Sequence, residues 1–256
     1  MRRTLALTFA LTTYAASAAA QSNGPNVSFL PRASFHMGAE HIRGSDDDRF
    51  RWDANFGGEL DLVDYTVGRL IFAANYQAIL GDELQAFDPN QGNYLLEGAL
   101  SARLRQVEGA LVFHHESRHL GDRAKEQPVD WNMLGGRAKS AFLLGATFLD
   151  VQGDLRWVVQ HSFVDYTWEL DTNIRADRLL RPGLGVLAAG GVRYLGVDGT
   201  AGRDGQTGFR AEGGIRFEGG GGAVELFVAA ERRIDPYPLE FSTATWMTAG
   251  FRLLSR

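Results

Sequence analysis

Residues 107–134 read VEGALVFHHESRHLGDRAKEQPVDWNML, and the interpretation of the whole chain rests on them. The first half alternates like a strand, so that Leu111, Phe113, His115 and Ser117 project to one face. A polar loop with glycine and proline follows, and the chain then returns through a second alternating segment. Asn132 lies on the apolar face of that second segment. The pattern predicts a β-hairpin with a histidine, a serine and an asparagine on its apolar face, near the loop.

The same alternation recurs along the chain, with one apolar and one charged face in each segment. Residues 50–62, 166–176 and 207–218 show it most clearly. There are about twelve such segments of about ten residues, the length that a tilted strand needs to cross a bilayer. The chain is therefore predicted to be all-β. The predicted strands cover residues 27–37, 50–62, 68–80, 94–105, 107–118, 132–148, 154–164, 166–176, 185–196, 207–218, 223–233 and 243–253.

The predicted connections alternate in length. Long polar connections cover residues 38–49, 81–93, 119–131, 197–206 and 234–242, and short ones lie at 64–65, 106, 152–153, 181–183 and 219–222. The connection near residue 165 is short and breaks the alternation. Long external loops and short periplasmic turns are typical of outer-membrane barrels, so we predict a closed antiparallel transmembrane β-barrel of about twelve strands. A secreted β-sandwich or jelly roll also alternates, but it gives no reason for alternating connection lengths.

The start of the chain and its composition fit this class. Residues 1–20 combine a charged start, a short apolar run and an Ala-x-Ala site, which predicts a secretory signal peptide before a barrel domain over residues 21–256. The chain has no cysteine, and its net charge of −5 gives no indication of nucleic-acid binding. After the signal, no segment has about 18 consecutive apolar residues, so no transmembrane helix is expected. We therefore predict a protein of the bacterial outer membrane.

In such a barrel the charged phase of each strand faces the lumen, and Phe56, Leu60, Leu170 and Phe209 should point outward. At about twelve strands the lumen is narrow, so paired charges are expected to fill it, with a selective pore as the alternative. Tryptophans at positions 52, 131, 168 and 246 fall where a strand meets a long loop, which predicts an aromatic girdle. The side chains expected in the lumen include Arg51, Asp53, Glu169, Asp171, Arg210 and Glu212.

His115, Ser117 and Asn132 have the composition of a hydrolase site. A serine becomes nucleophilic when a histidine takes its proton, and residues i and i+2 of a strand project side by side. A third group must hold the imidazole in the right tautomer, and asparagine can replace the usual acid. Two other interpretations remain open: a polar rim of His114, His115, His119 and Asp122 that orders the loop, or a metal site formed by His115, His119 and Asp122.

These residues resemble the outer-membrane phospholipase A family, whose twelve-stranded barrels carry a His-x-Ser pair and an asparagine on the following strand, facing lipid at the outer leaflet. The resemblance implies Ser117 as nucleophile, His115 as base and Asn132 as the residue that orients the base. Lipid A deacylases also carry a His-x-Ser pair on a barrel exterior. The run HESRHLGD at 115–122 is similar to the His-x-Ser-Ser-His-Leu-Gly-Asp motif of an uncharacterised envelope family. In the phospholipases Asn-Gly follows the serine, whereas this chain has Arg118 and His119.

We therefore expect a serine-type hydrolase that cleaves acyl esters of phospholipid or lipopolysaccharide in the outer leaflet. The alternative is a non-catalytic barrel, either a structural protein or a narrow pore with a charge-filled lumen. The resemblance implies calcium as a cofactor and is compatible with both a monomer and a homodimer. Membrane lipids are the expected partners, and nucleic acid is not.

Overall fold

The computed structural model describes residues 27–124 and 127–255, and the predicted signal peptide lies outside these ranges. The described chain forms a closed antiparallel β-barrel of twelve strands, which confirms the predicted fold class and strand number. No helix in this part of the chain is long and apolar enough to cross a membrane. The strands are β1 (Ser28–Arg43), β2 (Trp52–Asp64), β3 (Arg69–Gly81), β4 (Asp88–Leu104), β5 (Val107–Leu120), β6 (Val129–Leu144), β7 (Thr147–Ser162), β8 (Tyr166–Arg181), β9 (Leu184–Val197), β10 (Gln206–Gly219), β11 (Gly222–Ile234) and β12 (Thr243–Ser255).

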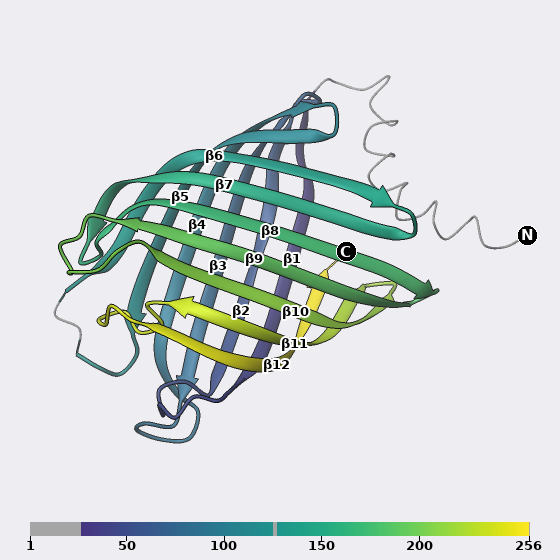
Figure 1. The fold of residues 1–256 in the computed structure, drawn as a ribbon. Coiled ribbons are helices and arrows are strands. Elements are labelled where there is room, and N and C mark those ends of the chain that lie inside the picture. Colours follow the sequence, from purple (N-terminus) through teal and green to yellow (C-terminus); the bar gives the residue numbers. More distant parts are fainter. Residues whose placement is uncertain (1–26, 125–126, 256) are drawn as a thin grey trace, which may run out of the picture.

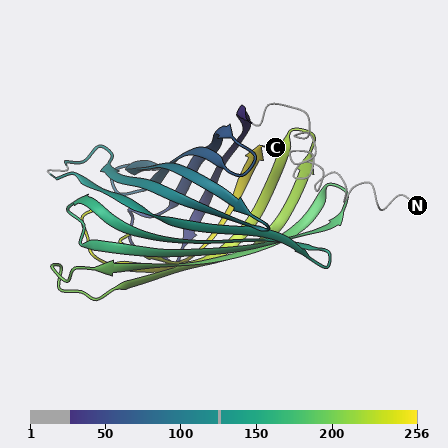
Figure 2. The same ribbon diagram turned by 90° about the horizontal axis from the view of Figure 1, so that it is seen from above.

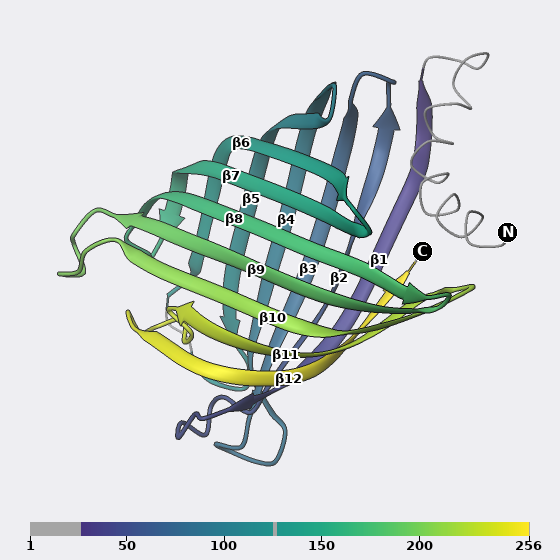
Figure 3. The same ribbon diagram turned by 45° about the vertical axis from the view of Figure 1, so that its right-hand side comes forward.

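Each strand pairs with its neighbours in sequence, and β1 closes the barrel by pairing with β12. This closing register runs from His36 opposite Leu254 to Arg43 opposite Met247. In Figures 1 and 3 strands β6–β10 cross in front of β2–β5, as expected for strands tilted against a barrel axis. Figure 2 shows the same walls from above. Because the described strands form a closed ring, their backbone groups find partners on both sides, as lipid requires.

Long loops and short turns gather at opposite ends of the barrel, as predicted. One end carries the loops 44–51, 82–87, 121–128, 198–205 and 235–242 and the shorter connection 163–165. The other end carries the turns 65–68, 105–106, 145–146, 182–183 and 220–221. In Figure 1 the β9–β10 and β11–β12 loops lie at the left, and the β8–β9 and β10–β11 turns lie at the right. We call these the loop end and the turn end; in outer-membrane barrels the loop end is extracellular.

One predicted turn is wrong. The sequence predicts a turn at Gln152 and Gly153, but both residues lie within β7 and pair with β6. The chain turns instead at residues 145–146, where Gly145 has a φ of 62° that closes a two-residue hairpin. Gln152 is polar because its side chain faces the lumen, where Nε2 donates to Asp154 Oδ2 at 2.8 Å.

The outer surface of the barrel carries an apolar belt. Phe56, Leu170 and Phe209 point outward and are 51%, 41% and 43% exposed, and Leu60 shares their outward phase. Each strand contributes at least one exposed large apolar side chain to this surface. A continuous apolar surface of this size would be unfavourable in water and is favourable against lipid chains. The belt therefore marks the barrel as a membrane-spanning one.

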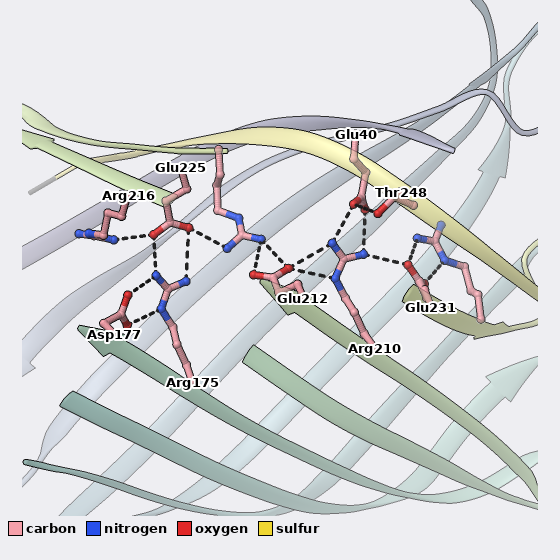
Figure 4. A network of polar contacts seen from close by, with 11 residues as sticks. Glu40, Arg175, Asp177, Arg210, Glu212, Arg216, Glu225, Glu231 and Thr248 are labelled. Atoms are coloured by element: carbon pink, nitrogen blue, oxygen red, sulfur yellow. Dashed lines mark hydrogen bonds and ion pairs between the residues drawn. The ribbon is translucent and has the colours of Figure 1, made fainter. Parts of the chain in front are cut away.

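Ion pairs occupy much of the lumen, as Figure 4 shows for one network. Arg210 of β10 contacts Glu40 of β1 at 2.7 Å and Glu231 of β11 at 3.0 Å. The fully buried carboxylate of Glu225 contacts three arginines at 2.6 to 3.1 Å, which are Arg175, Arg216 and Arg252. The expected lumenal positions of five residues are confirmed: Asp53, Glu169, Asp171, Arg210 and Glu212.

Arg51 is the exception among the predicted lumenal residues. It precedes β2 instead of lying in it, and its guanidinium contacts Asp48 in its own loop. It also contacts Asp82 in the next long loop at 3.3 Å. Arg51 therefore links two loops at the loop end and does not project into the lumen.

A second ion-pair network lies on the wall formed by β4 to β9. Arg137 donates to both carboxylate oxygens of Glu97, at 2.6 Å and 2.8 Å. Arg193 contacts Glu169 at 2.5 Å and Glu116 at 3.2 Å. Removing one partner of a buried ion pair leaves an uncompensated charge. A one-residue slip of a strand would separate these pairs, so the networks fix which side chains of each strand face the lumen.

The predicted tryptophan girdle is wrong for Trp131 and Trp246. They are 0% and 4% exposed and belong to two apolar clusters inside the loop end. The alternation that turns Asn132 outward necessarily turns Trp131 inward. Trp52 and Trp168 lie on the outward phase, where Trp168 packs against another aromatic ring, that of Tyr194, at 5.1 Å.

Candidate active site

The predicted site residues lie on the outer surface of the barrel, on β5 and β6. Along β5 the alternate residues are buried in the lumen, whereas His115, Ser117 and His119 lie on the outer phase. Toward the turn end the same face continues with Phe113 and Leu111, which are 45% and 66% exposed. The polar side chains therefore lie at the loop end of the apolar belt, facing lipid.

His115 and Asn132 form the central contact of this site. They lie opposite each other in the β5–β6 register, and His115 Nδ1 is 2.8 Å from Asn132 Oδ1. An amide oxygen can only accept, so Nδ1–H donates and Nε2 is the basic nitrogen of the ring. A histidine in this state can take a proton from a hydroxyl group.

A chain of hydrogen bonds sets the orientation of the Asn132 amide. Asn132 Nδ2 donates to Gln160 Oε1, and Gln160 Nε2 donates to Asp130 Oδ1 at 3.3 Å. A carboxylate only accepts, so Asp130 fixes which way Gln160 points, and Gln160 fixes which way Asn132 points. This series of hydrogen bonds ends at His115, where the Asn132 oxygen holds the proton on Nδ1.

Asp130 and Gln160 also belong to this site, although neither is among the predicted residues. Asp130 shares the outward phase of Asn132, so alternation alone would have found it. Gln160 was hidden by a β-bulge, because β7 pairs Gln160 with Asn132 but Val158 with Met133, which leaves Val159 unpaired. Counting by alternation from the exposed Trp157 puts Gln160 in the lumen, and the extra residue returns it to the outer face.

Ser117 lies one outward position closer to the loop than His115. It is opposite Tyr94 on β4 and Asp130 on β6, and its Oγ is 3.4 Å from His119 Nε2. Within residues 27–124 and 127–255, no hydrogen bond joins Ser117 to His115. The structure thus places the serine between two histidines of one face and couples His115 to Asn132.

The polar-rim interpretation is wrong for His114, and the metal-site interpretation is wrong as a whole. His114 does not join an outer rim, because it faces the lumen with Nδ1 3.1 Å from Glu97 Oε2. The described ranges contain no group of three or more His, Cys, Asp or Glu side chains placed to hold a metal ion. A metal site of His115, His119 and Asp122 is therefore not formed.

An aromatic row leads across the outer surface to this site. The rings of Phe56, Tyr76 and Tyr94 follow one another on β2, β3 and β4, with centroids 5.3 Å and 4.8 Å apart. The last ring, Tyr94, meets His119 edge-on at 5.3 Å. Aromatic side chains of this kind favour the level of the lipid headgroups, where the ester bonds of membrane lipids lie.

Comparison with known proteins shows the fold. No protein-family model and no curated protein sequence matches the chain. The outer membrane phospholipase A of Escherichia coli gives a TM-score of 0.53 at 12% identity, over 89% of this chain and 93% of its own. The calcium-bound outer membrane phospholipase dimer of Salmonella typhi gives 0.53 at 13% identity, over 94% and 96%. An outer membrane channel of Pseudomonas putida F1 also gives 0.53 at 13% identity, over 91% and 98%.

The fold and the apolar belt define the class of protein: a twelve-stranded β-barrel of the bacterial outer membrane. At 12–13% identity the likeness establishes the fold and nothing finer, because a phospholipase and a channel share it equally. The function therefore depends on which side chains the barrel carries and where they lie.

Proposed function

We propose that this barrel is a serine-type lipid hydrolase that cleaves acyl esters in the outer leaflet. The observation that carries the proposal is the hydrogen bond between His115 and Asn132, beside Ser117 on the lipid-facing surface. Polar groups that face lipid cost free energy, so a paired histidine and asparagine at this position call for a function. An oriented imidazole next to a hydroxyl is what nucleophilic catalysis by serine requires.

In the proposed reaction Ser117 is the nucleophile, His115 the general base and Asn132 the residue that orients the base. Rotation about the Cα–Cβ bond of Ser117 turns its hydroxyl from His119 toward His115. Nε2 of His115 then takes the hydroxyl proton as Oγ attacks the ester carbonyl carbon. The contact with Asn132 keeps the other proton on Nδ1, so that Nε2 is the nitrogen that takes up the hydroxyl proton.

The position of the site supports a lipid as the substrate. It opens to the membrane instead of to the lumen, at the loop end, where the outer leaflet meets the barrel. Two barrels of the same fold are named as phospholipases, which favours an acyl ester. Phospholipid and the acyl esters of lipopolysaccharide are the two candidate substrates.

Calcium does not fit the residues around Ser117. The ion takes six to eight oxygen ligands, with carboxylates prominent among them. Asp130 supplies one carboxylate opposite Ser117, but Arg118 and His119 follow the serine, and no acidic cluster is placed to hold a metal in the described residues. The proposed mechanism therefore has no step that depends on calcium.

The test is release of fatty acid from mixed detergent micelles that contain either phosphatidylethanolamine or lipid A. Wild-type protein should release fatty acid from one of the two, and Ser117→Ala should release none above background. Ser140→Ala is a matched control, because its hydroxyl donates to a backbone oxygen in the turn of Gln106, at the other end of β6. Equal rates for wild type and Ser117→Ala would rule out the serine mechanism.

A second candidate is a non-catalytic barrel with a charge-filled lumen, either structural or weakly conducting. The ion-pair networks of the lumen favour it, since they give the interior a role independent of the outer site. A wild-type protein that cleaves neither lipid, while remaining folded and heat-modifiable on gels, would decide for this candidate.

A further inference from the structure

The proposed reaction leaves one requirement unmet. Attack of Ser117 on an ester turns the carbonyl oxygen into an oxyanion, and hydrolases stabilise that charge with preorganised hydrogen-bond donors. Backbone N–H groups often supply these donors. Here Ser117 lies inside the sheet and pairs with Tyr94 on one side and Asp130 on the other. The strand's N–H groups serve these two ladders, so the donor has to be a side chain.

His119 is the side chain in position to act as this donor. It lies two residues from Ser117 on the same outward face, is exposed, and has Nε2 3.4 Å from the serine Oγ. Tyr94 meets its ring edge-on with centroids 5.3 Å apart, which restricts the orientation of the ring. Rotation of the Ser117 hydroxyl toward His115 leaves Cα and Cβ in place, so His119 stays beside the carbonyl that Oγ attacks.

We propose that His119 Nε2–H stabilises the oxyanion, so that Ser117 is served by two histidines with different tasks. This inference rests on the proposed esterase function and extends it by one catalytic residue. His115 is assigned as the base because its Nδ1–H donates a hydrogen bond to the Asn132 oxygen, which leaves Nε2 as the basic nitrogen. His119 is assigned as the donor because its Nε2 lies beside Ser117 while His115 already supplies the basic nitrogen.

The acylation step balances with these two roles. The Oγ–C bond forms, the Oγ proton passes to His115 Nε2, and the carbonyl π electrons move to the oxygen that His119 contacts. When the tetrahedral intermediate collapses, the C–O bond to the lipid alcohol breaks and the alcohol leaves with the proton from His115. A water molecule then repeats the sequence on the acyl-serine, releases the fatty acid and restores Ser117.

The experiment compares His119→Ala and His119→Gln in the full-length protein in detergent micelles, with a p-nitrophenyl ester as substrate. Removing one oxyanion donor typically lowers kcat about 10²–10³-fold, so His119→Ala should fall in this range with KM little changed. Glutamine offers an N–H donor but no base, so His119→Gln should recover activity to within about tenfold of wild type. The shape of the pH–rate profile should be the same in wild type and in both variants, because His119 is not the base.

Controls separate this inference from a loss of fold and from the proposed function itself. His161→Ala, an exposed histidine on β7, should leave kcat unchanged, and every variant should keep its heat-modifiable mobility on gels. An active wild type with unaffected His119 variants would overturn the inference alone. So would equal losses in His119→Ala and His119→Gln together with loss of the pH dependence, since His119 would then be the base. An inactive wild type would overturn the proposed function and the inference together.

Discussion

At the scale of single residues, the tautomer of His115 depends on a carboxylate that does not touch it. Asp130 accepts from Gln160, Gln160 accepts from Asn132, and Asn132 accepts from His115. Each amide has a donor side and an acceptor side, so one acceptor at the far end fixes the direction of the whole chain. These hydrogen bonds also provide partners for polar side chains that would otherwise face lipid unpaired.

Replacing Asn132 by alanine should reduce activity without abolishing it. Asn132 holds the base in its tautomer and forms no bond to the substrate, so Asn132→Ala should lower kcat on the order of tenfold, below the 10²–10⁴-fold typical of losing the base itself. Steady-state rates of ester cleavage measure this. Asn173→Ala, an asparagine of the lumenal wall, should behave like wild type. A loss as complete as that of Ser117→Ala would contradict an orienting role.

The outer face of the site could be predicted from the sequence because it follows from alternation alone. His115, Ser117 and Asn132 lie on the phase of Phe113 and Leu134, and that phase is apolar. Which hydrogen bonds these side chains form depends on rotamers and on a neighbouring strand, and neither follows from alternation. The contact of Ser117 with His119 instead of His115 is of this kind.

At the scale of elements, bulges and turns limited the prediction. Alternation is reliable until a strand gains a residue, as β7 does at Val159, after which every later side chain changes face. The turn predicted at Gln152 and Gly153 is wrong because the sequence pattern is ambiguous. A polar residue beside a glycine is typical of a turn, but it is equally suited to a strand whose polar side chains face the lumen. The turn forms instead at Gly145, where a glycine takes the positive φ that the two-residue hairpin requires.

The loop 44–51 is fastened to the loop 235–242 by one arginine. Arg49 donates to Asp47 at 2.7 Å and to Glu240 at 2.7 Å, and its guanidinium lies 4.2 Å from the centre of the Tyr237 ring. The hydrogen bond from Arg49 holds the pKa of the Asp47 carboxyl below its usual value of 3.8. Both loops lie outside the membrane-spanning strands.

This contact should weaken in acid. Because the pKa of Asp47 is lower in the folded loop than in the unfolded chain, its stabilising contribution is complete above about pH 4 and is lost as the pH falls through the lowered value. Hydrogen exchange of the amides at 45–51 should therefore be slow at about pH 6 and faster, relative to the intrinsic rate, at about pH 2.5. In the Asp47→Asn variant these amides should exchange at the faster rate, relative to the intrinsic rate, at both pH values. Equal protection of the wild-type loop at the two values would argue against the contact.

At the scale of the whole molecule, the stability of the barrel should depend on its lumenal charges. Glu225 is fully buried among three arginines, so Glu225→Gln leaves those arginines with less compensation and should cost roughly 3–5 kcal/mol. Urea unfolding in micelles, followed by gel mobility, measures the change. Glu218 contacts the same Arg216 but is 42% exposed, so Glu218→Gln should cost less than about 1 kcal/mol. Similar costs for both variants would mean that burial does not strengthen these pairs.

The arrangement of the lumen predicts how the protein conducts ions. Two neighbouring cavities lie between the charged side chains of the described residues, with volumes of about 330 Å³ and 210 Å³. Arg210, Glu231 and Arg233 line both of them, so these side chains form the partition between the two spaces. Each is held by ion pairs, Arg210 with Glu231 at 3.0 Å and Arg233 with Glu231 at 2.6 Å. A partition that is both charged and paired leaves little open path for a hydrated ion.

Wild-type protein in planar bilayers should therefore show only small, infrequent currents. Removing both members of one pair, in the double variant Arg210→Ala and Glu231→Ala, joins the cavities while keeping the net charge, and should raise single-channel conductance several-fold. The matched double variant Arg123→Ala and Glu83→Ala removes a pair at 2.6 Å outside the lumen and should conduct like wild type. Large, steady wild-type currents would contradict the ion-pair partition, because an open path would then have to pass Arg210 and Glu231 while they remain paired.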